Sequence, residues 1–224
     1  MPRIRKAASI WRSDQAREAA ARVLVPERAD CFVFDPEAWF GREAKLELEI
    51  GAGRGDFIIA RAAVNPDRNF LAVELATPVA RLMGVRAGRR GLTNLRILRM
   101  DARTLVNLML PGGRLDVCHI YFPDPWPKGR HSKHRLFTPY FASRLARVLA
   151  PSAPLHVATD VGDYAAAIYA MLEGAGFVRS TLPVPGASET GYAHKFIRSG
   201  RSVYAATFTL PDWGMAQSVR TPKG

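Results

Sequence analysis

A seven-residue segment, Phe122-Pro123-Asp124-Pro125-Trp126-Pro127-Lys128, combines side chains suited to chemistry with a stiff backbone. Its three prolines fix three φ angles and remove three backbone donors, so the segment is neither a helix nor a central strand. It follows an apolar run, Val117 to Phe122, that is typical of a buried strand. We therefore predict a rigid loop at the carboxyl end of a strand, where open α/β sheets bind their ligands. Such a loop holds the carboxylate of Asp124 in place before any reaction begins.

A glycine turn joins an earlier strand to its helix, in the run Leu48-Glu49-Ile50-Gly51-Ala52-Gly53-Arg54-Gly55-Asp56-Phe57. Gly51 and Gly53 permit a tight turn with positive φ and let a ligand approach the backbone. The spacing is Gly-x-Gly-x-Gly, and Asp56 stands where a dinucleotide-binding turn has its third glycine. An acid near this helix N-terminus is also a poor neighbour for a pyrophosphate. A simple strand-to-helix turn is the alternative interpretation.

Three acidic residues lie at matching places near the ends of predicted strands. Glu74 ends the second strand, where a carboxylate can accept hydrogen bonds from two ribose hydroxyls. Asp101 and Ala102 follow the third strand, where an adenine ring would lie, and Glu49 precedes the glycine turn, where it can meet a cationic group. One such acid alone is usually a cap or a solvated turn residue. Together with the glycines they suit a ligand with a ribose, an adenine and a positive charge, which S-adenosylmethionine fits better than NAD does.

These residues need a scaffold of alternating strands and helices. The sequence pattern predicts strands at 46–50, 69–75, 95–100, 115–122, 154–159 and 202–210, with another that opens at 176–177. It predicts helices at 54–64, 78–90, 138–149 and 164–173, and a short helix at 12–23 that Ser13 would cap. Strands separated by helices of this length imply right-handed crossovers, so the predicted fold is α/β with a mostly parallel sheet.

The length of 224 residues fits one large domain with a substantial core. We predict a basic, partly flexible N-terminal arm at 1–35, the main domain at 36–212 and a C-terminal tail at 213–224. Cys31 and Cys118 do not make a disulfide framework in a chain this long, which points to a reducing cytosol. No apolar run approaches the roughly 18 residues needed to cross a bilayer. Cys118 and His119 fall in an apolar strand, which indicates core packing and no metal site.

The net charge of +12 favours a polyanionic partner, first nucleic acid and second an anionic membrane surface. Basic residues form three clusters, at 1–22, 81–103 and 128–147, and the last of these contains no acid. Solvated helix faces account for some of these residues. Phosphate contacts, which give affinity and salt dependence but little sequence information, suit Lys128, Arg130, Lys133 and Arg135.

On these residues, the chain resembles the bacterial tRNA (guanine-N7)-methyltransferases from about residue 40 to residue 210. The segments that carry the resemblance are Leu48-Glu49-Ile50-Gly51-x-Gly53-x-Gly55, Asn69 to Glu74, Asn94-Leu95-Arg96 followed by Asp101-Ala102, Phe122 to Lys128 with His131 to Leu136, and Ala158-Thr159-Asp160 followed by Tyr164. The Phe-Pro-Asp-Pro-Trp-x-Lys signature is far more specific than the glycine turn, which many methyltransferases share.

The resemblance implies a Rossmann-like, S-adenosylmethionine-dependent methyltransferase fold, with a seven-stranded, mostly parallel sheet flanked by helices. It implies a cytoplasmic enzyme, a monomer or homodimer without metal or membrane attachment, that methylates N7 of a guanosine in the tRNA variable loop to give 7-methylguanosine. By resemblance, Asp124 is the catalytic candidate. The expected cofactor contacts are Glu49, Gly51, Gly53, Glu74, Asp101, Ala102 and Asp124. The expected substrate contacts are Lys128, Asp160, Thr190 and Tyr192.

Two of these residues have open roles. We expect Asp124 to orient guanine by accepting from its ring and amino N–H groups, and to stabilise the positive charge that develops on the ring. The alternative is that Asp124 caps the loop and pairs with Lys128. Asp160 either holds substrate or caps the helix that follows it.

Near the C-terminus the chain departs from the family, which has Thr-x-Phe-Glu where this sequence has Thr190-Gly191-Tyr192-Ala193. One alternative is therefore a diverged member that binds cofactor and RNA but has weak, absent or altered methyl-acceptor activity. Another is a nicotinamide dehydrogenase, which the absent third glycine and the charge of +12 oppose.

Overall fold

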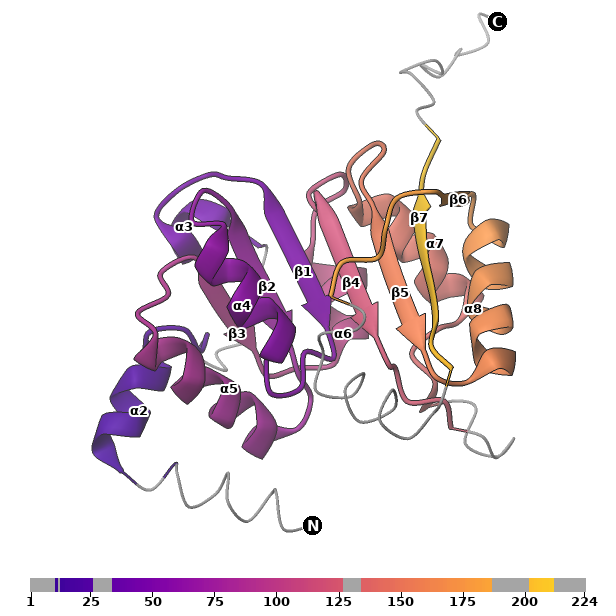
Figure 1. Cartoon of the computed structure of the whole chain (residues 1–224). Helices are drawn as coiled ribbons and strands as arrows, with labels where there is room; N and C mark the ends of the chain where they lie inside the picture. The colour runs from indigo at the N-terminus through magenta and orange to yellow at the C-terminus, as the bar shows by residue number, and fades with distance from the viewer. Residues whose placement is uncertain (1–10, 12, 26–33, 127–133, 187–201, 212–224) are drawn as a thin grey trace, which may run out of the picture.

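The computed structural model describes residues 11, 13–25, 34–126, 134–186 and 202–211 of the chain (Figure 1). Within these residues, seven strands form one sheet that has helices on both faces. The strands are β1 (Leu46–Ile50), β2 (Asn69–Val73), β3 (Leu95–Leu98), β4 (Val117–Tyr121), β5 (Leu155–Thr159), β6 (Val178–Ser180) and β7 (Tyr204–Thr209). The predicted strands are confirmed, and most of them end one or two residues earlier than the sequence pattern suggested.

The strand order is β3-β2-β1-β4-β5-β7-β6. Strands β1 to β5 pair in parallel, whereas β7 runs antiparallel to both β5 and β6. The register places Ile50, the last residue of β1, beside Val73 of β2 and Ile120 of β4. Because parallel strands end at the same edge of a sheet, the loops that follow β1, β2, β3 and β4 meet there. The predicted mostly parallel, seven-stranded sheet is confirmed.

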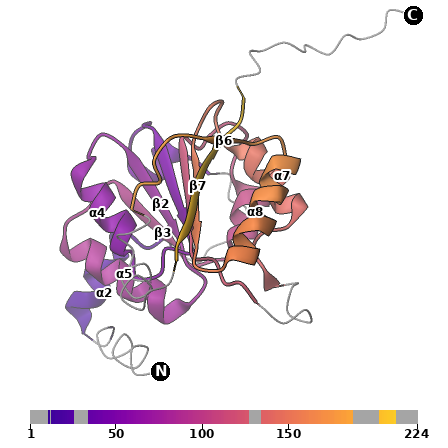
Figure 2. The same cartoon turned by 45° about the vertical axis from the view of Figure 1, so that its right-hand side comes forward.

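The helices cover the sheet in two layers. They are α2 (Asp14–Ala21), α3 (Pro36–Phe40), α4 (Asp56–Val64), α5 (Thr77–Arg89), α6 (Ala102–Thr104), α7 (Pro139–Val148) and α8 (Gly162–Gly174), with a π-helical turn, η1 (Leu105–Met109). Helices α2, α4 and α5 lie on one side of the sheet, and α7 and α8 lie on the other (Figure 2). Thr138 begins α7 by accepting a hydrogen bond from the backbone N–H of Phe141 at 3.0 Å.

The central strands are buried on both faces. Every residue of β1, β2, β4 and β5 is buried, and most of these residues are apolar. The two largest clusters of the apolar core are one that includes the residues under α7 and α8, and one between α4, α5 and strands β2 and β3. Two glutamates and two histidines, Glu47, Glu49, His119 and His156, lie in these strands and are buried with the apolar residues.

Part of the predicted N-terminal arm is packed against the domain. Ser13 caps α2 as predicted, because its side chain accepts a hydrogen bond from the N–H of Ala16 at 3.2 Å. Helix α2 packs closely against α5. A Cβ added to Gly88 of α5 would lie 1.7 Å from the carbonyl oxygen of Ala19 in α2. The chain then meets the edge of β3, where the N–H of Val25 donates to the carbonyl oxygen of Ile97 at 3.0 Å.

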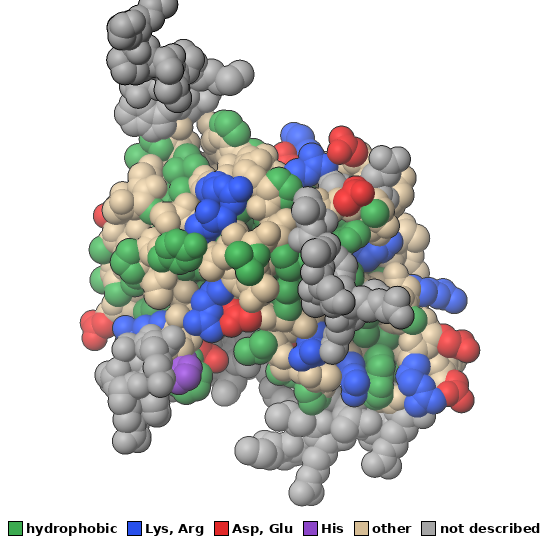
Figure 3. Space-filling view, turned by 180° about the vertical axis from the view of Figure 1, so that it is seen from behind, with side chains coloured by type: hydrophobic (Ala, Val, Ile, Leu, Met, Phe, Trp, Pro, Cys, Tyr) green, Lys and Arg blue, Asp and Glu red, His purple; other side chains and the backbone are tan. Residues whose placement is uncertain are grey.

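The surface carries its basic side chains in scattered groups. Seen from behind, Lys and Arg side chains are spread among hydrophobic and uncharged ones (Figure 3). On α5, the side chains of Arg81 and Arg89 are exposed. Among the described helices, none is both long and apolar enough to cross a membrane.

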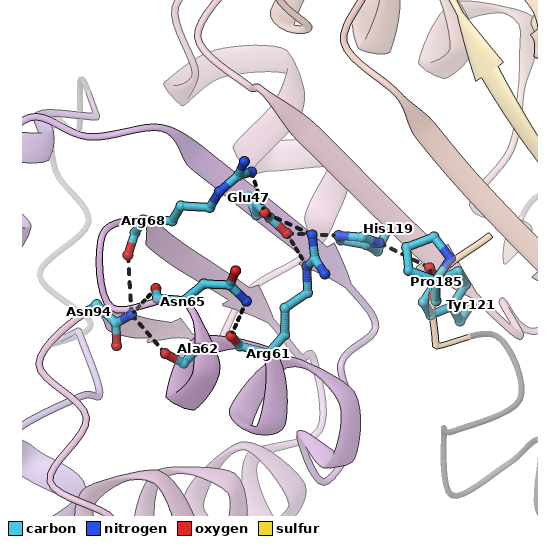
Figure 4. A network of polar contacts seen from close by, with 9 residues as sticks. All are labelled: Glu47, Arg61, Ala62, Asn65, Arg68, Asn94, His119, Tyr121 and Pro185. Carbon is cyan, nitrogen blue, oxygen red and sulfur yellow. Dashed lines mark hydrogen bonds and ion pairs between the residues drawn. The ribbon is translucent and has the colours of Figure 1, made fainter. Parts of the chain in front are cut away.

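A network of buried polar side chains connects β1, α4 and β4 (Figure 4). Burial alone would raise the pKa of Glu47, but hydrogen bonds from His119 and Arg61 outweigh it and lower this pKa to about 2. The other ring nitrogen of His119 lies 3.0 Å from the hydroxyl of Tyr121, which donates to the carbonyl oxygen of Pro185 at 2.5 Å. The network therefore fixes Tyr121, the last residue of β4, just before the proline-rich loop.

Candidate active site

A cavity of about 450 Å³ opens at the edge of the sheet where β1, β2, β3 and β4 end. The sequence-predicted site residues in its wall are Gly51, Gly53, Glu74, Asp101, Ala102 and Asp124. These residues come from four separate loops, spread over more than seventy positions of the chain. The structure thus brings the glycine turn, two of the strand-end acids and the proline-rich loop to one place.

The glycine turn is tied to Glu74 on the neighbouring strand end. Gly51 and Gly53 have φ values of 73° and 57°, in the left-handed region where glycine is favoured. The N–H of Gly53 donates to Oε2 of Glu74 at 3.0 Å, and the N–H of Ala76 donates to Oε1 at 2.8 Å. Because an ionised carboxylate has about four acceptor sites, Glu74 retains free lone pairs that can accept from ligand hydroxyls.

Glu49 lies beneath the turn and is only 4% exposed. Its carboxyl group accepts a hydrogen bond from the backbone N–H of Ile58, near the start of α4. The second oxygen, Oε2, has no hydrogen-bond partner among the described residues. Burial raises the pKa of Glu49 to about 8, and the nearby carboxylates of Asp56 and Glu74 add to the rise. A cationic ligand group nearby would reverse this effect by stabilising the ionised form.

Asp101 is held by an arginine that the sequence analysis did not single out. It begins α6 and accepts a hydrogen bond from the backbone N–H of Arg103 at 2.8 Å. The guanidinium of Arg103 also binds it, with Nη2 at 2.6 Å from Oδ2. These hydrogen bonds lower the pKa of Asp101 despite its partial burial. Arg103 itself lines the cavity. The sequence feature that could have identified it is its position two residues after Asp101, the acid at the strand end.

The described part of the proline-rich loop begins and ends in unusual backbone conformations. Phe122 and Trp126, which flank its described part, have φ values of 51° and 39°, a region that non-glycine residues seldom adopt. The loop is anchored at its start, where the N–H of Phe122 donates to the carbonyl oxygen of Ala158 at 2.7 Å. The side chain of Asp124 is exposed and makes no hydrogen bond to another described residue. Trp126 packs beside His134, with ring centroids 5.2 Å apart.

The predicted substrate contacts are only partly within the described structure. Lys128, Thr190 and Tyr192 lie outside the described residues. Asp160 follows β5 directly and is half-buried, next to the strand that carries the proline-rich loop. Val161 occupies the N-cap position of α8, so Asp160 stands one residue before it, and both alternatives for Asp160, substrate contact and helix cap, stay predictions.

Arg135 contacts the backbone of the proline-rich loop, and the phosphate contact that the sequence suggested for it stays a prediction. Its Nε donates to the carbonyl oxygen of Pro125 at 2.8 Å, so its guanidinium is turned toward the protein backbone. The other three basic residues of that prediction, Lys128, Arg130 and Lys133, lie outside the described residues.

Apolar residues complete the cavity wall, and sequence periodicity did not identify them. They are Ile50, Val73, Leu75, Val79, Met100, Tyr121, Phe122 and Leu136. Leu75 is 63% exposed, which is unusual for a leucine that follows a buried strand. Among the described residues, no group of three or more His, Cys, Asp and Glu side chains could hold a metal ion. His119, predicted as core, is fully buried in the network of Figure 4.

Comparisons with known proteins agree with this geometry. Residues 43–206 match the model of a family described as "Putative methyltransferase". A tRNA (guanine-N(7)-)-methyltransferase of Halorhodospira halophila is 38% identical over 198 residues, which cover 85% of this chain and 84% of that protein. One of Paracidovorax citrulli is 46% identical over 159 residues, which cover 71% of this chain and 61% of that protein.

The fold also matches solved structures. The structure of the 16S rRNA methyltransferase KamB aligns with a TM-score of 0.59 and 22% identity, and covers 84% of this chain and 99% of that one. A methyltransferase structure from Aquifex aeolicus, described as SAM-dependent, aligns with a TM-score of 0.53 and 16% identity, over 89% of this chain and all of that one. At these identities the likeness shows the fold, which is the Rossmann-like methyltransferase fold.

Proposed function

Because the chain belongs to the tRNA (guanine-N(7)-)-methyltransferase family, we propose that it transfers a methyl group from S-adenosylmethionine to N7 of a guanosine in the variable loop of tRNA. The observation that carries this proposal is the convergence of the glycine turn, Glu74, Asp101 and Asp124 on one cavity. A cofactor and an acceptor base need such a common site, because methyl transfer requires the two reacting atoms in line and close together.

The residues present fit this cofactor. Glu74 has free acceptor sites for two ribose hydroxyls, and Asp101 and Ala102 stand at the third strand end, where the adenine would lie. The buried carboxyl group of Glu49, with Oε2 unpartnered among the described residues, suits the positive charge of the methionine part. S-adenosylmethionine, when bound, supplies an electrophilic methyl group on a sulfonium centre. The turn at Gly51 and Gly53 leaves room for close approach of the ligand to the backbone.

Asp124 is the proposed catalytic residue. Guanine N7 already carries a lone pair, so no base has to remove a proton before the methyl group is transferred. The carboxylate orients the base by accepting from its ring and amino N–H groups, and it stabilises the positive charge that develops on the ring. In the free protein Asp124 is exposed and makes no hydrogen bond to a described residue, so its acceptor sites are available to a base. The loop's two left-handed residues and its prolines restrict the positions open to this carboxylate.

The RNA contacts are proposed from the family resemblance and from charge. Lys128, Asp160, Thr190 and Tyr192 are the proposed acceptor contacts, and the net charge of +12 supports binding to a polyanion. Nothing in the comparisons favours the diverged, weakly active alternative raised by Ala193. The proposed site of action is the cytoplasm, and the proposed catalytic domain spans residues 36–212.

The test is methyl transfer from labelled S-adenosylmethionine to unmodified tRNA transcripts, followed by aniline cleavage at 7-methylguanosine. Label and cleavage at a variable-loop guanosine support the proposal. Cofactor binding without label in any tRNA would exclude the proposed activity and favour the diverged member, with Ala193→Glu as the next variant.

A further inference from the structure

Arg135 holds the far end of the proline-rich loop. Its guanidinium makes two contacts with the backbone, from Nε to the carbonyl oxygen of Pro125 at 2.8 Å and from Nη2 to that of Trp126 at 3.3 Å. These are the two carbonyl groups that follow Asp124 in the chain. The planar guanidinium is suited to this task, because its donors diverge in a fixed fork that an ammonium group lacks.

The guanidinium is itself fixed on an aromatic ring. Its central carbon lies 5.2 Å from the centroid of the Tyr164 ring, a distance at which a cation and a ring face attract each other. Tyr164 is 3% exposed and stands in the first turn of α8. Burial raises the pKa of Tyr164, and among the neighbouring charges Arg135 lowers it and Asp124 raises it, so both charges lie near this ring.

The loop needs such a restraint because its backbone is strained. The left-handed φ values of Phe122 and Trp126 are unfavourable for non-glycine residues. At the start of the loop, the hydrogen bond from Phe122 to Ala158 opposes relaxation. At the other end, Arg135 supplies the hydrogen bonds to the carbonyl groups of Pro125 and Trp126.

We propose that Arg135 is a positioning residue: it fixes the two carbonyl groups after Asp124 and so sets the direction in which the Asp124 carboxylate points. The inference rests on the proposed function, because Asp124 is the proposed catalytic residue of that reaction. The competing role is a contact to an RNA phosphate, which the sequence suggested for Arg135. A positioning role changes the rate of methyl transfer, whereas a phosphate contact changes RNA affinity and its salt dependence.

The main experiment compares Arg135→Lys with Asp124→Asn and with the double variant, at saturating cofactor and several salt concentrations. Arg135→Lys keeps the charge and loses the fork, so kcat should fall on the order of 10- to 100-fold while KM for tRNA and its salt dependence stay unchanged. In the Asp124→Asn background the same change should cost less than about threefold, because Arg135 then has no carboxylate to position. Equal losses in both backgrounds, or a loss confined to KM, would overturn the proposal.

Two matched variants serve as controls. Arg179→Lys alters another arginine that lies over a tyrosine ring, at 4.7 Å from the centroid of Tyr169 and away from the cavity wall, so it should leave kcat unchanged. Tyr164→Phe keeps the aromatic face and should retain the wild-type kcat. Tyr164→Leu removes this face, so its kcat should fall as that of Arg135→Lys does.

A second measurement does not depend on activity. The carbonyl-carbon NMR chemical shifts of Pro125 and Trp126 should change in Arg135→Lys, because the hydrogen bonds to these oxygens are lost, and should stay unchanged in Arg179→Lys. Unchanged shifts at these two carbonyl carbons would overturn the positioning role even if the variant were inactive. If wild-type protein methylates no tRNA while the carbonyl shifts respond as expected, the proposed function fails and the restraint of the loop by Arg135 stands.

Discussion

The carboxyl group of Glu49 is held in an environment that opposes its ionisation. It is 4% exposed, and burial raises its pKa to about 8, with further repulsion from Asp56 and Glu74. The free protein would be more stable with a neutral side chain at this position. Natural proteins keep such a buried carboxyl group where a ligand needs it. Function and stability should therefore respond in opposite directions when this carboxyl group is replaced.

We predict that Glu49→Gln stabilises the free protein at alkaline pH. The folded-state pKa of about 8 lies above the ordinary 4.5, so the stability that this group contributes is present below pH 4.5 and is lost as pH rises toward 8. Glutamine mimics the neutral form, so the variant should match wild type near pH 4.5 and exceed it by about 4 kcal/mol at pH 8. Urea denaturation across this pH range measures the difference.

The same variant should bind S-adenosylmethionine at least about tenfold more weakly, which calorimetry can detect. Glu43→Gln provides the control, because the side chain of Glu43 is 72% exposed and pairs with Arg114 at the surface. If the stabilities of wild type and Glu49→Gln run parallel from pH 4.5 to 8, the account of Glu49 is wrong.

Among the helices, strands and loops, the sequence predicted those features that depend on the local residue pattern. Strand β1 was predicted with its observed bounds, because apolar residues alternate with glutamates from Leu46 to Ile50 and a glycine turn follows directly. The stiffness of the loop around Asp124 followed from its prolines. Helix α3, helix α6 and the turn η1 were missed because each spans five residues or fewer, too short to show a helical period.

Contacts between distant residues could not be predicted from the sequence. The pairing of Arg135 with the loop carbonyls and the packing of α2 on α5 depend on the completed fold. The acids at the strand ends were identified because their positions follow a general rule of α/β sheets. No such rule predicts which apolar residues line a cavity, so Leu75 and Met100 were identified only from the structure.

The contact between α2 and α5 yields a prediction about stability. A Cβ at Gly88 would lie 1.7 Å from the carbonyl oxygen of Ala19, so Gly88→Ala must push the two helices apart and should destabilise the protein by about 1–3 kcal/mol. Gly174→Ala is the matched control, because nothing lies within 4 Å of the added methyl group and alanine favours helix. Chemical denaturation of both variants measures the difference. Equal stabilities would show that α2 is not packed as described.

At the scale of the whole molecule, charge should govern the encounter with RNA. The net charge is +12, and exposed arginines such as Arg81 and Arg89 lie on α5, which starts at the rim of the cavity. Phosphate contacts release counterions, so binding to a polyanion weakens steeply with salt. A small acceptor molecule would not show this behaviour.

We predict that the Kd for tRNA rises on the order of 100-fold or more between about 50 and 200 mM salt. The Kd for S-adenosylmethionine should change less than about threefold over the same range, because its site lies within the protein and makes no phosphate contacts. Filter binding and calorimetry in matched buffers provide the two values. Similar salt dependence for both ligands would contradict an RNA acceptor.

The most direct test of the central claim is the single-turnover rate of methyl transfer to tRNA by Asp124→Ala at saturating cofactor. We expect a rate on the order of 100-fold or more below wild type, because the carboxylate that orients guanine and stabilises its developing charge is lost. Asp163→Asn, an exposed change in the first turn of α8, should leave the rate unchanged. A near wild-type rate for Asp124→Ala would contradict the assignment of this cavity edge as the centre of the reaction.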